Sequence, residues 1–244
     1  MIRAMRKLSI LLATLIISVS SLFTACDNDG YSLDKFWVSF ATVKTISDNS
    51  YYLQLDNGET LWPAAQGFHY SPTNNERVLA NYTILSDEQD GYDHFVRVNS
   101  LSKILTKGII DLTTNNQDSI GNDKVVIEDI WYSGEYLNVI FGYNTSNGFI
   151  HYINLVNNTT VEHPEDGKVH LEFRHNKNNA PETYGARGVV SFKLDKIISD
   201  EDGEVKISVK ANEFKGEKTY DITINKEYIT NKNISPLEDN INIK

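Results

Sequence analysis

The 244-residue chain carries 23 basic and 33 acidic side chains, which gives a formal net charge of −10. This length allows two ordinary domains or one large β domain, and the acidic balance argues against nucleic-acid binding because phosphate backbones would be repelled. The single cysteine, Cys26, excludes a disulfide within the chain, so the fold must be held by packing. The 13 Tyr, 10 Phe and 3 Trp supply much of the apolar area for it.

Residues 1–25 have the layout of a lipoprotein signal peptide. Three basic residues precede the apolar run 8–19, which is too short to cross about 30 Å of hydrocarbon. Small residues then lead to Cys26, so we expect cleavage after residue 25 and attachment of lipid, including palmitate, at Cys26. The lipid would anchor the chain in the outer membrane, on its periplasmic or cell-surface face. Residues 26–35 are a tether, whose acidic start is either a solvated spacer or a signal for surface export.

Residues 36–111 are predicted to form a small β-barrel. The strongest local pattern is the pair Tyr51–Leu55 and Glu59–Trp62 around Asn57-Gly58, because Asn-Gly supplies the positive φ angles of a tight hairpin turn. Pro63 lacks an amide hydrogen and is expected to end the second of these strands. Three more strands are expected at 36–46, 77–85 and 94–101. Five short strands without an amphipathic helix favour a closed barrel, since an open sheet would have edges to cover.

Residues 112–123 are predicted to be an interdomain linker, because they are almost all polar. Within them, Asp118-Ser119-Ile120 matches a short O-glycosylation pattern, which makes Ser119 a candidate modification site. From 124 to 230, seven segments alternate apolar and polar residues, and this pattern indicates an antiparallel two-sheet sandwich. Residues 231–244 are rich in Asn and Lys and are expected to be a loose tail.

One predicted sandwich strand carries the polar residues most suggestive of chemistry. His170, Glu172 and Arg174 share one of its faces, and His175 follows. Such spacing can present a metal-ligand pair or an acid–base pair. Arg174, however, would repel a cation, and a solvated outer face needs polar residues in any case. The solvated face is the favoured interpretation.

Other acidic residues give weaker patterns. Asp200 and Asp202 begin like a calcium loop but lack the later bidentate glutamate. Glu128 and Asp129 are adjacent on a predicted strand, so they point to opposite faces and cannot by themselves form a glycosidase pair. We therefore expect no catalytic residue, no metal site and no cofactor.

Aromatic residues of the first domain are the better candidates for binding. Trp37 and Trp62 could line a ligand groove, but tryptophans in a small barrel without cysteines are more often core, and we expect both in the core. Phe68 and Tyr70 fall in the stretch 64–75, where no strand is predicted. We expect these two to form a ligand-binding loop, since barrels of this size often bind along one face and its neighbouring loops.

The chain resembles the NigD-like lipoproteins. The resemblance rests on the lipoprotein signal, the hairpin-rich first half, the stretch Val126–Asn138 (VIEDIWYSGEYLN) and the stretch Leu171–Asn176 (LEFRHN). It implies an all-β protein with an OB-type barrel followed by a β-sandwich. It also implies a role in bacteriocin immunity, although none of these stretches is a catalytic signature.

Three classes of function stay open at this point. The leading hypothesis is a non-enzymatic, membrane-anchored protein that binds a peptide or protein ligand in the envelope. The alternatives are a carbohydrate-active hydrolase, whose carboxylates would meet only in the fold, and a structural or assembly partner of outer-membrane proteins. Converging carboxylates about 5 to 10 Å apart would favour the hydrolase, and a large exposed apolar patch would favour the assembly partner.

Overall fold

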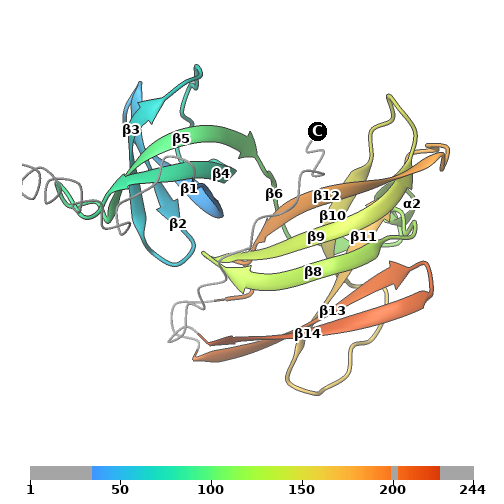
Figure 1. Cartoon of the computed structure of the whole chain (residues 1–244). Helices are drawn as coiled ribbons and strands as arrows, with labels where there is room; N and C mark the ends of the chain where they lie inside the picture. Colours follow the sequence, from blue (N-terminus) through green and yellow to red (C-terminus); the bar gives the residue numbers. More distant parts are fainter. Residues whose placement is uncertain (1–34, 199–202, 226–244) are drawn as a thin grey trace, which may run out of the picture.

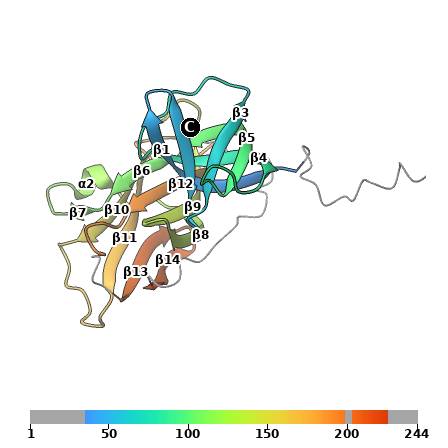
Figure 2. The same ribbon diagram turned by 90° about the vertical axis from the view of Figure 1, so that its left-hand side faces the viewer.

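The computed structural model describes residues 35–198 and 203–225, which form a closed barrel followed by two packed sheets (Figure 1). Figure 1 shows the barrel beside one end of the sandwich, and Figure 2, turned by 90°, views the molecule from the side of the barrel. Cys26, Asp200, Asp202 and the segment 231–244 lie outside the described residues. Within the described ranges, no helix is long and apolar enough to cross a membrane.

Five strands make the barrel: β1 (Trp37–Ser47), β2 (Ser50–Leu55), β3 (Thr60–Gln66), β4 (Arg77–Ser86) and β5 (His94–Lys103). Their order is β1-β2-β3-β5-β4, and β4 pairs with β1 to close the ring. Neighbouring strands are antiparallel except β3 and β5, which run parallel. Alternate side chains point inward and form one apolar core, with Val43, Leu53, Leu61, Val78 and Val96 fully buried. The predicted small closed barrel is confirmed.

The predicted hairpin around Asn57-Gly58 joins β2 to β3. Gly58 has a φ of 94°, and the Leu55 amide donates to the Glu59 carbonyl at 2.8 Å. The expectation for Pro63 was wrong, because β3 continues to Gln66. The strand tolerates the missing amide by an irregularity in its pairing with β5 between Pro63 and Ala65.

The sandwich contains nine strands and one short helix. They are β6 (Leu105–Gly108), β7 (Ile110–Leu112), α2 (Gln117–Ile120), β8 (Val126–Ser133), β9 (Tyr136–Thr145), β10 (Tyr152–Asn158), β11 (Val169–Asn176), β12 (Tyr184–Lys193), β13 (Glu204–Glu213) and β14 (Gly216–Asn225). One sheet has the order β14-β13-β11-β10-β7, and the other has the order β6-β12-β9-β8. Apolar side chains between the sheets form one core that includes Leu137, Phe173, Phe192 and Ile207. The pairs β11–β13, β12–β6 and β10–β7 are parallel, and the other pairs are antiparallel.

The boundary between the domains differs from the expected barrel 36–111 and linker 112–123. The barrel strands end at Lys103, and the next residues add β6 to one sandwich sheet and β7 to the other. Ile109, between them, is buried in the sandwich core. The polar stretch is also structured, since α2 buries Ile120 against Leu112 and Val156. A four-residue segment with one apolar residue is too short a pattern to predict this helix.

Candidate functional site

Four aromatic side chains gather on the outside of the barrel, and we call this group the barrel aromatic surface. They are Tyr52 on β2, Trp62 on β3, Tyr92 in the β4–β5 loop and Phe95 on β5. The Tyr92 ring lies 4.9 Å from Trp62 and 5.5 Å from Tyr52 between centroids, and Phe95 lies 6.3 Å from Trp62. Strand alternation explains the outward direction, because Leu53 and Leu61, next to Tyr52 and Trp62, fill the core.

The β4–β5 loop holds Tyr92 over the strands. Tyr92 and Gln89 form a pair of backbone hydrogen bonds at 3.0 and 3.1 Å across the tip of the loop. At its base, the Asp93 carboxylate accepts bonds from the Thr60 hydroxyl and amide, each at 2.7 Å. These bonds from Thr60 lower the pKa of Asp93, so the carboxylate stays charged and the loop stays attached to β3. An aromatic side chain that is already fixed loses little conformational entropy when a ligand binds to it.

The residues singled out from the sequence for binding lie elsewhere. Phe68 and Tyr70 are half-buried against the barrel core, and Tyr70 packs edge-on against Tyr51 at 5.3 Å. The Tyr70 hydroxyl donates to Glu76 at 2.6 Å, and burial together with this carboxylate raises the pKa of Tyr70. The expectation of a core position was wrong for Trp37, whose exposed fraction is 44%, and Trp62 faces outward from the barrel.

The sandwich strand β11 buries a carboxylate that was expected on a solvated face. Glu172 is 4% exposed and accepts bonds from Asn158 at 3.1 Å and from Arg174 at 2.7 Å, with Lys210 at 3.1 Å. Burial alone would raise the pKa of Glu172, but these donors outweigh it and hold the pKa below its usual value. His170 instead bonds Asp166 at 2.8 Å near the surface. Among the described residues, no three metal-ligating side chains converge.

A histidine pair ties β11 to the start of β10, with His175 buried and His151 half-buried. Nδ1 of His151 lies 2.8 Å from Nε2 of His175, and the rings are stacked with an interplanar angle of 8°. The Lys124 carbonyl accepts a hydrogen bond from Nδ1 of His175 at 3.3 Å, so Nε2 of His175 accepts the bond from Nδ1 of His151. Thr145 bonds the far nitrogen of His151 at 2.6 Å. Burial lowers the pKa of both residues, to about 4 for His175, and the facing charge of Asp123 opposes this only weakly.

The histidine pair predicts a loss of stability in mild acid. In the unfolded chain His175 binds a proton near pH 6.5, whereas in the fold its lowered pKa delays protonation until about pH 4, so stability falls as the pH drops through this window. The loss is of the order of 3 kcal/mol for His175 at the most. Thermal melts at pH 7, 6, 5 and 4 measure it. His175→Gln should flatten the dependence, while His69→Gln, at an exposed position, should not. If stability depends on pH equally in the two variants, His175 is not the source of the acid sensitivity.

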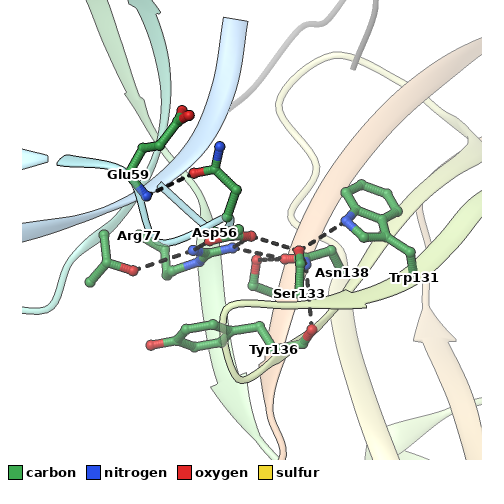
Figure 3. Close-up of polar contacts among 10 residues, drawn as sticks. Asp56, Glu59, Arg77, Trp131, Ser133, Tyr136 and Asn138 are labelled. Atoms are coloured by element: carbon green, nitrogen blue, oxygen red, sulfur yellow. Dashed lines mark hydrogen bonds and ion pairs between the residues drawn. The ribbon is translucent and has the colours of Figure 1, made fainter. Parts of the chain in front are cut away.

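The two domains meet at a buried polar network around Arg77 (Figure 3). The Arg77 guanidinium, at the start of β4, pairs with both oxygens of Asp56 in the β2–β3 turn. It also donates to Asn138 on β9 at 3.1 Å. From the sandwich, Ser133 donates to Asp56 at 2.7 Å and accepts a bond from Asn138 at 3.0 Å. The Tyr136 ring covers the guanidinium at 4.3 Å.

Apolar contacts surround this network. Phe40 of β1 meets Trp131 of β8 edge-on at 5.2 Å, and Ile104, Ile140 and Val189 complete the cluster. These residues come from both domains and from the junction between them. The stretch 126–138, which carried the family resemblance, therefore supplies Trp131, Ser133, Tyr136 and Asn138 to the domain interface. The contact between the barrel and the sandwich is therefore charged and hydrogen-bonded.

Ser119, the candidate glycosylation site, is exposed in α2. Its hydroxyl donates to the Asn116 carbonyl at 2.9 Å. Because the hydroxyl reaches solvent, the position is compatible with the modification, which stays a prediction.

Comparisons with known proteins agree with this architecture. Residues 40–104 match the NigD-like N-terminal OB domain, and residues 108–224 match the NigD-like C-terminal β-sandwich domain. Among curated proteins, none matches the chain.

Several solved structures are similar over most of the chain. A Bacteroides vulgatus protein of unknown function is 34% identical with a TM-score of 0.73, over 83% of this chain and 97% of that one. A Parabacteroides distasonis protein described as toxin-related is 33% identical with a TM-score of 0.69, over 78% and 94%. A NigD-like immunity protein of Bacteroides caccae is 27% identical with a TM-score of 0.60, over 78% and 93%. With both family domains matched in order along one chain, this protein belongs to the NigD-like family.

Proposed function

We propose that this protein is a lipid-anchored envelope protein without catalytic activity, which binds a peptide or protein toxin and thereby acts in immunity. The observation that carries the proposal is the barrel aromatic surface, which lies on the outer face of β2 and β3 and under the β4–β5 loop. In OB-type barrels this face and this loop form the usual ligand surface, which in other proteins binds oligonucleotides and oligosaccharides. The immunity and toxin-related relatives support the same class of function. The anchor is the lipid expected at Cys26, with the membrane as the protein's first partner.

The buried titratable groups support binding over hydrolysis. A glycosidase needs two carboxylates about 5 to 10 Å apart across its substrate. The buried carboxylate Glu172 and the half-buried Asp56 lie in different domains, and each is paired with an arginine. The neutral histidine pair is enclosed by its own hydrogen bonds. Each group is thus occupied by structural partners.

A second candidate, an assembly role, is favoured by one exposed apolar group. Phe149 and Ile150, in the β9–β10 loop, are 44% and 66% exposed, and Tyr152 and Tyr184 beside this end of the sheets are similarly open. Exposed apolar residues that gather in this way mark contact sites for other proteins more often than scattered ones do.

Co-purification from solubilised envelopes tests the proposal. Trp62→Ala and Tyr92→Ala should each reduce recovery of the bound partner about tenfold or more, since buried aromatic anchors contribute about 2 kcal/mol at an interface. Phe68→Ala and Tyr70→Ala test the loop expected from the sequence, and Ile150→Ser tests the assembly role. All variants are compared at equal envelope abundance.

Each outcome points to one surface. Loss of the partner only in Trp62→Ala and Tyr92→Ala supports the proposal. Loss only in Phe68→Ala or Tyr70→Ala would move the binding site to the 64–75 loop. Loss of the partner only in Ile150→Ser would favour the assembly role over the role in immunity.

A further inference from the structure

We infer that Asn147, in the β9–β10 loop, converts spontaneously to aspartate or isoaspartate with the help of the Tyr184 hydroxyl. The conversion adds a negative charge beside Phe149 and Ile150, the exposed apolar side chains of this loop. Older protein therefore presents a different surface at this end of the sandwich from newly made protein.

The reaction needs only the chain itself and water. The backbone nitrogen of the residue after asparagine attacks Cγ of the asparagine side chain and forms a cyclic imide, while the side-chain nitrogen leaves as ammonia with the proton of the attacking nitrogen. Water then opens the imide at either carbonyl, which gives aspartate or isoaspartate without a change of oxidation state. Glycine after the asparagine favours the attack, because a residue without a Cβ leaves the approach open and the backbone free to rotate.

The pair Asn147-Gly148 meets the requirements of this reaction. Both residues are exposed, so water reaches them. In the part of the chain that the structure describes, the Gly148 amide donates to no backbone carbonyl and is therefore available as the nucleophile. Nothing lies within 4 Å of a Cβ placed on Gly148, so the turn has room to rearrange.

The Tyr184 hydroxyl, at the start of β12, activates the side-chain amide of Asn147. It donates a hydrogen bond to Oδ1 of Asn147 at 2.8 Å. This oxygen takes up negative charge when the backbone nitrogen attacks Cγ, and a donor already placed on it stabilises the charged intermediate. Tyr184 is 45% exposed, so water competes with its hydroxyl. We therefore expect a smaller effect than the roughly hundredfold one of a donor in an enclosed oxyanion hole.

The chain contains a second Asn-Gly pair, Asn57-Gly58 in the β2–β3 turn, whose nucleophile is occupied. The Gly58 amide donates to the Leu55 carbonyl at 3.0 Å. The Asn57 side chain is held as well, because its Oδ1 accepts a bond from the Glu59 amide at 3.0 Å. Attack at Asn57 must first break the hairpin turn. The fold therefore favours the reaction at Asn147 over the same reaction at Asn57.

Peptide mass spectrometry of the full mature protein, incubated at pH 8, tests the inference. Conversion is measured by the mass difference between an amide and a carboxyl group at each asparagine. The variant Tyr184→Phe removes the hydroxyl that bonds Asn147. The matched control, Tyr152→Phe, removes the hydroxyl of a similarly exposed tyrosine that has no hydrogen bond to Asn147 in the described structure. A parallel incubation in guanidinium chloride unfolds the chain and removes the influence of the fold on both pairs.

We expect Asn147 to convert about tenfold faster than Asn57 in the folded protein, and the two to convert at similar rates in the unfolded chain. Tyr184→Phe should slow the conversion of Asn147 about threefold or more, and Tyr152→Phe should leave it unchanged. The inference is wrong if Asn147 stays intact or converts no faster than Asn57 in the folded protein. A difference that persists in guanidinium chloride, or equal rates in the two tyrosine variants, would also contradict it.

Discussion

Replacing Arg77 by methionine is expected to lower the free energy of unfolding by about 3 to 5 kcal/mol, because it removes the cation from the carboxylate of Asp56 and leaves that charge at a largely buried interface with the Ser133 hydroxyl as its remaining donor. The Arg77 side chain is fully buried, and that of Asp56 is 13% exposed. The substitution also removes the donor to Asn138 and the cation over the Tyr136 ring.

Chemical denaturation followed by circular dichroism measures this loss. The matched control is Arg187→Met, which breaks another arginine–carboxylate pair, that with Glu128, at the surface. The side chains of this pair are 31% and 34% exposed, so we expect a cost of about 1 kcal/mol or less. Similar costs for the two variants would show that the Arg77 network does not stabilise the fold.

Gly134→Ala is expected to have the second large effect, by pushing the β8–β9 turn away from the barrel. Gly134 has a φ of 54°, and a Cβ placed there would lie 2.4 Å from Oδ1 of Asp56. The backbone strain costs about 1 to 2 kcal/mol, and the clash adds to it because Asp56 is fixed by Arg77. The total should exceed 2 kcal/mol, and calorimetry should show the two domains beginning to unfold separately.

Gly148→Ala provides the control for backbone strain. Gly148 has a φ of 83° in the β9–β10 loop, and nothing lies within 4 Å of a Cβ added there. The difference between the two variants isolates the contact with Asp56. If both cost the same and unfolding stays a single transition, the turn does not fix the position of the barrel.

Much of the architecture could be predicted from local patterns. Alternation along the strands and the Asn57-Gly58 turn give the barrel and the sandwich, because a half-buried strand has a period of two. Residues 104–112 were harder to predict, because this segment passes from one sandwich sheet to the other and adds only a short strand to each sheet. Such short edge strands are defined by their partners β12 and β10, and not by their own sequence.

The domain interface and the aromatic surface could not be predicted in the same way. Arg77 and Asn138 are 61 positions apart, and each sits in an ordinary strand pattern. Tyr92 falls in a polar turn, and only the folding of that turn over β2 and β3 brings it to Trp62 and Tyr52. Phe68 and Tyr70 looked free because no strand was expected there, whereas the loop packs them onto the core.

Thiol-directed crosslinking tests most directly whether the barrel aromatic surface is the site of contact. Cys26 is the sole cysteine, so in a mature chain carrying Cys26→Ser an introduced cysteine is the unique attachment point for a photoreactive probe. Gln89→Cys places the probe on the loop beside Tyr92, and Val161→Cys places it on an exposed sandwich loop. After illumination with solubilised envelopes, we expect a defined protein or peptide adduct from position 89, which Trp62→Ala abolishes, and none from position 161. An adduct from position 161 alone, or one from position 89 that persists with Trp62→Ala, would contradict binding at this surface.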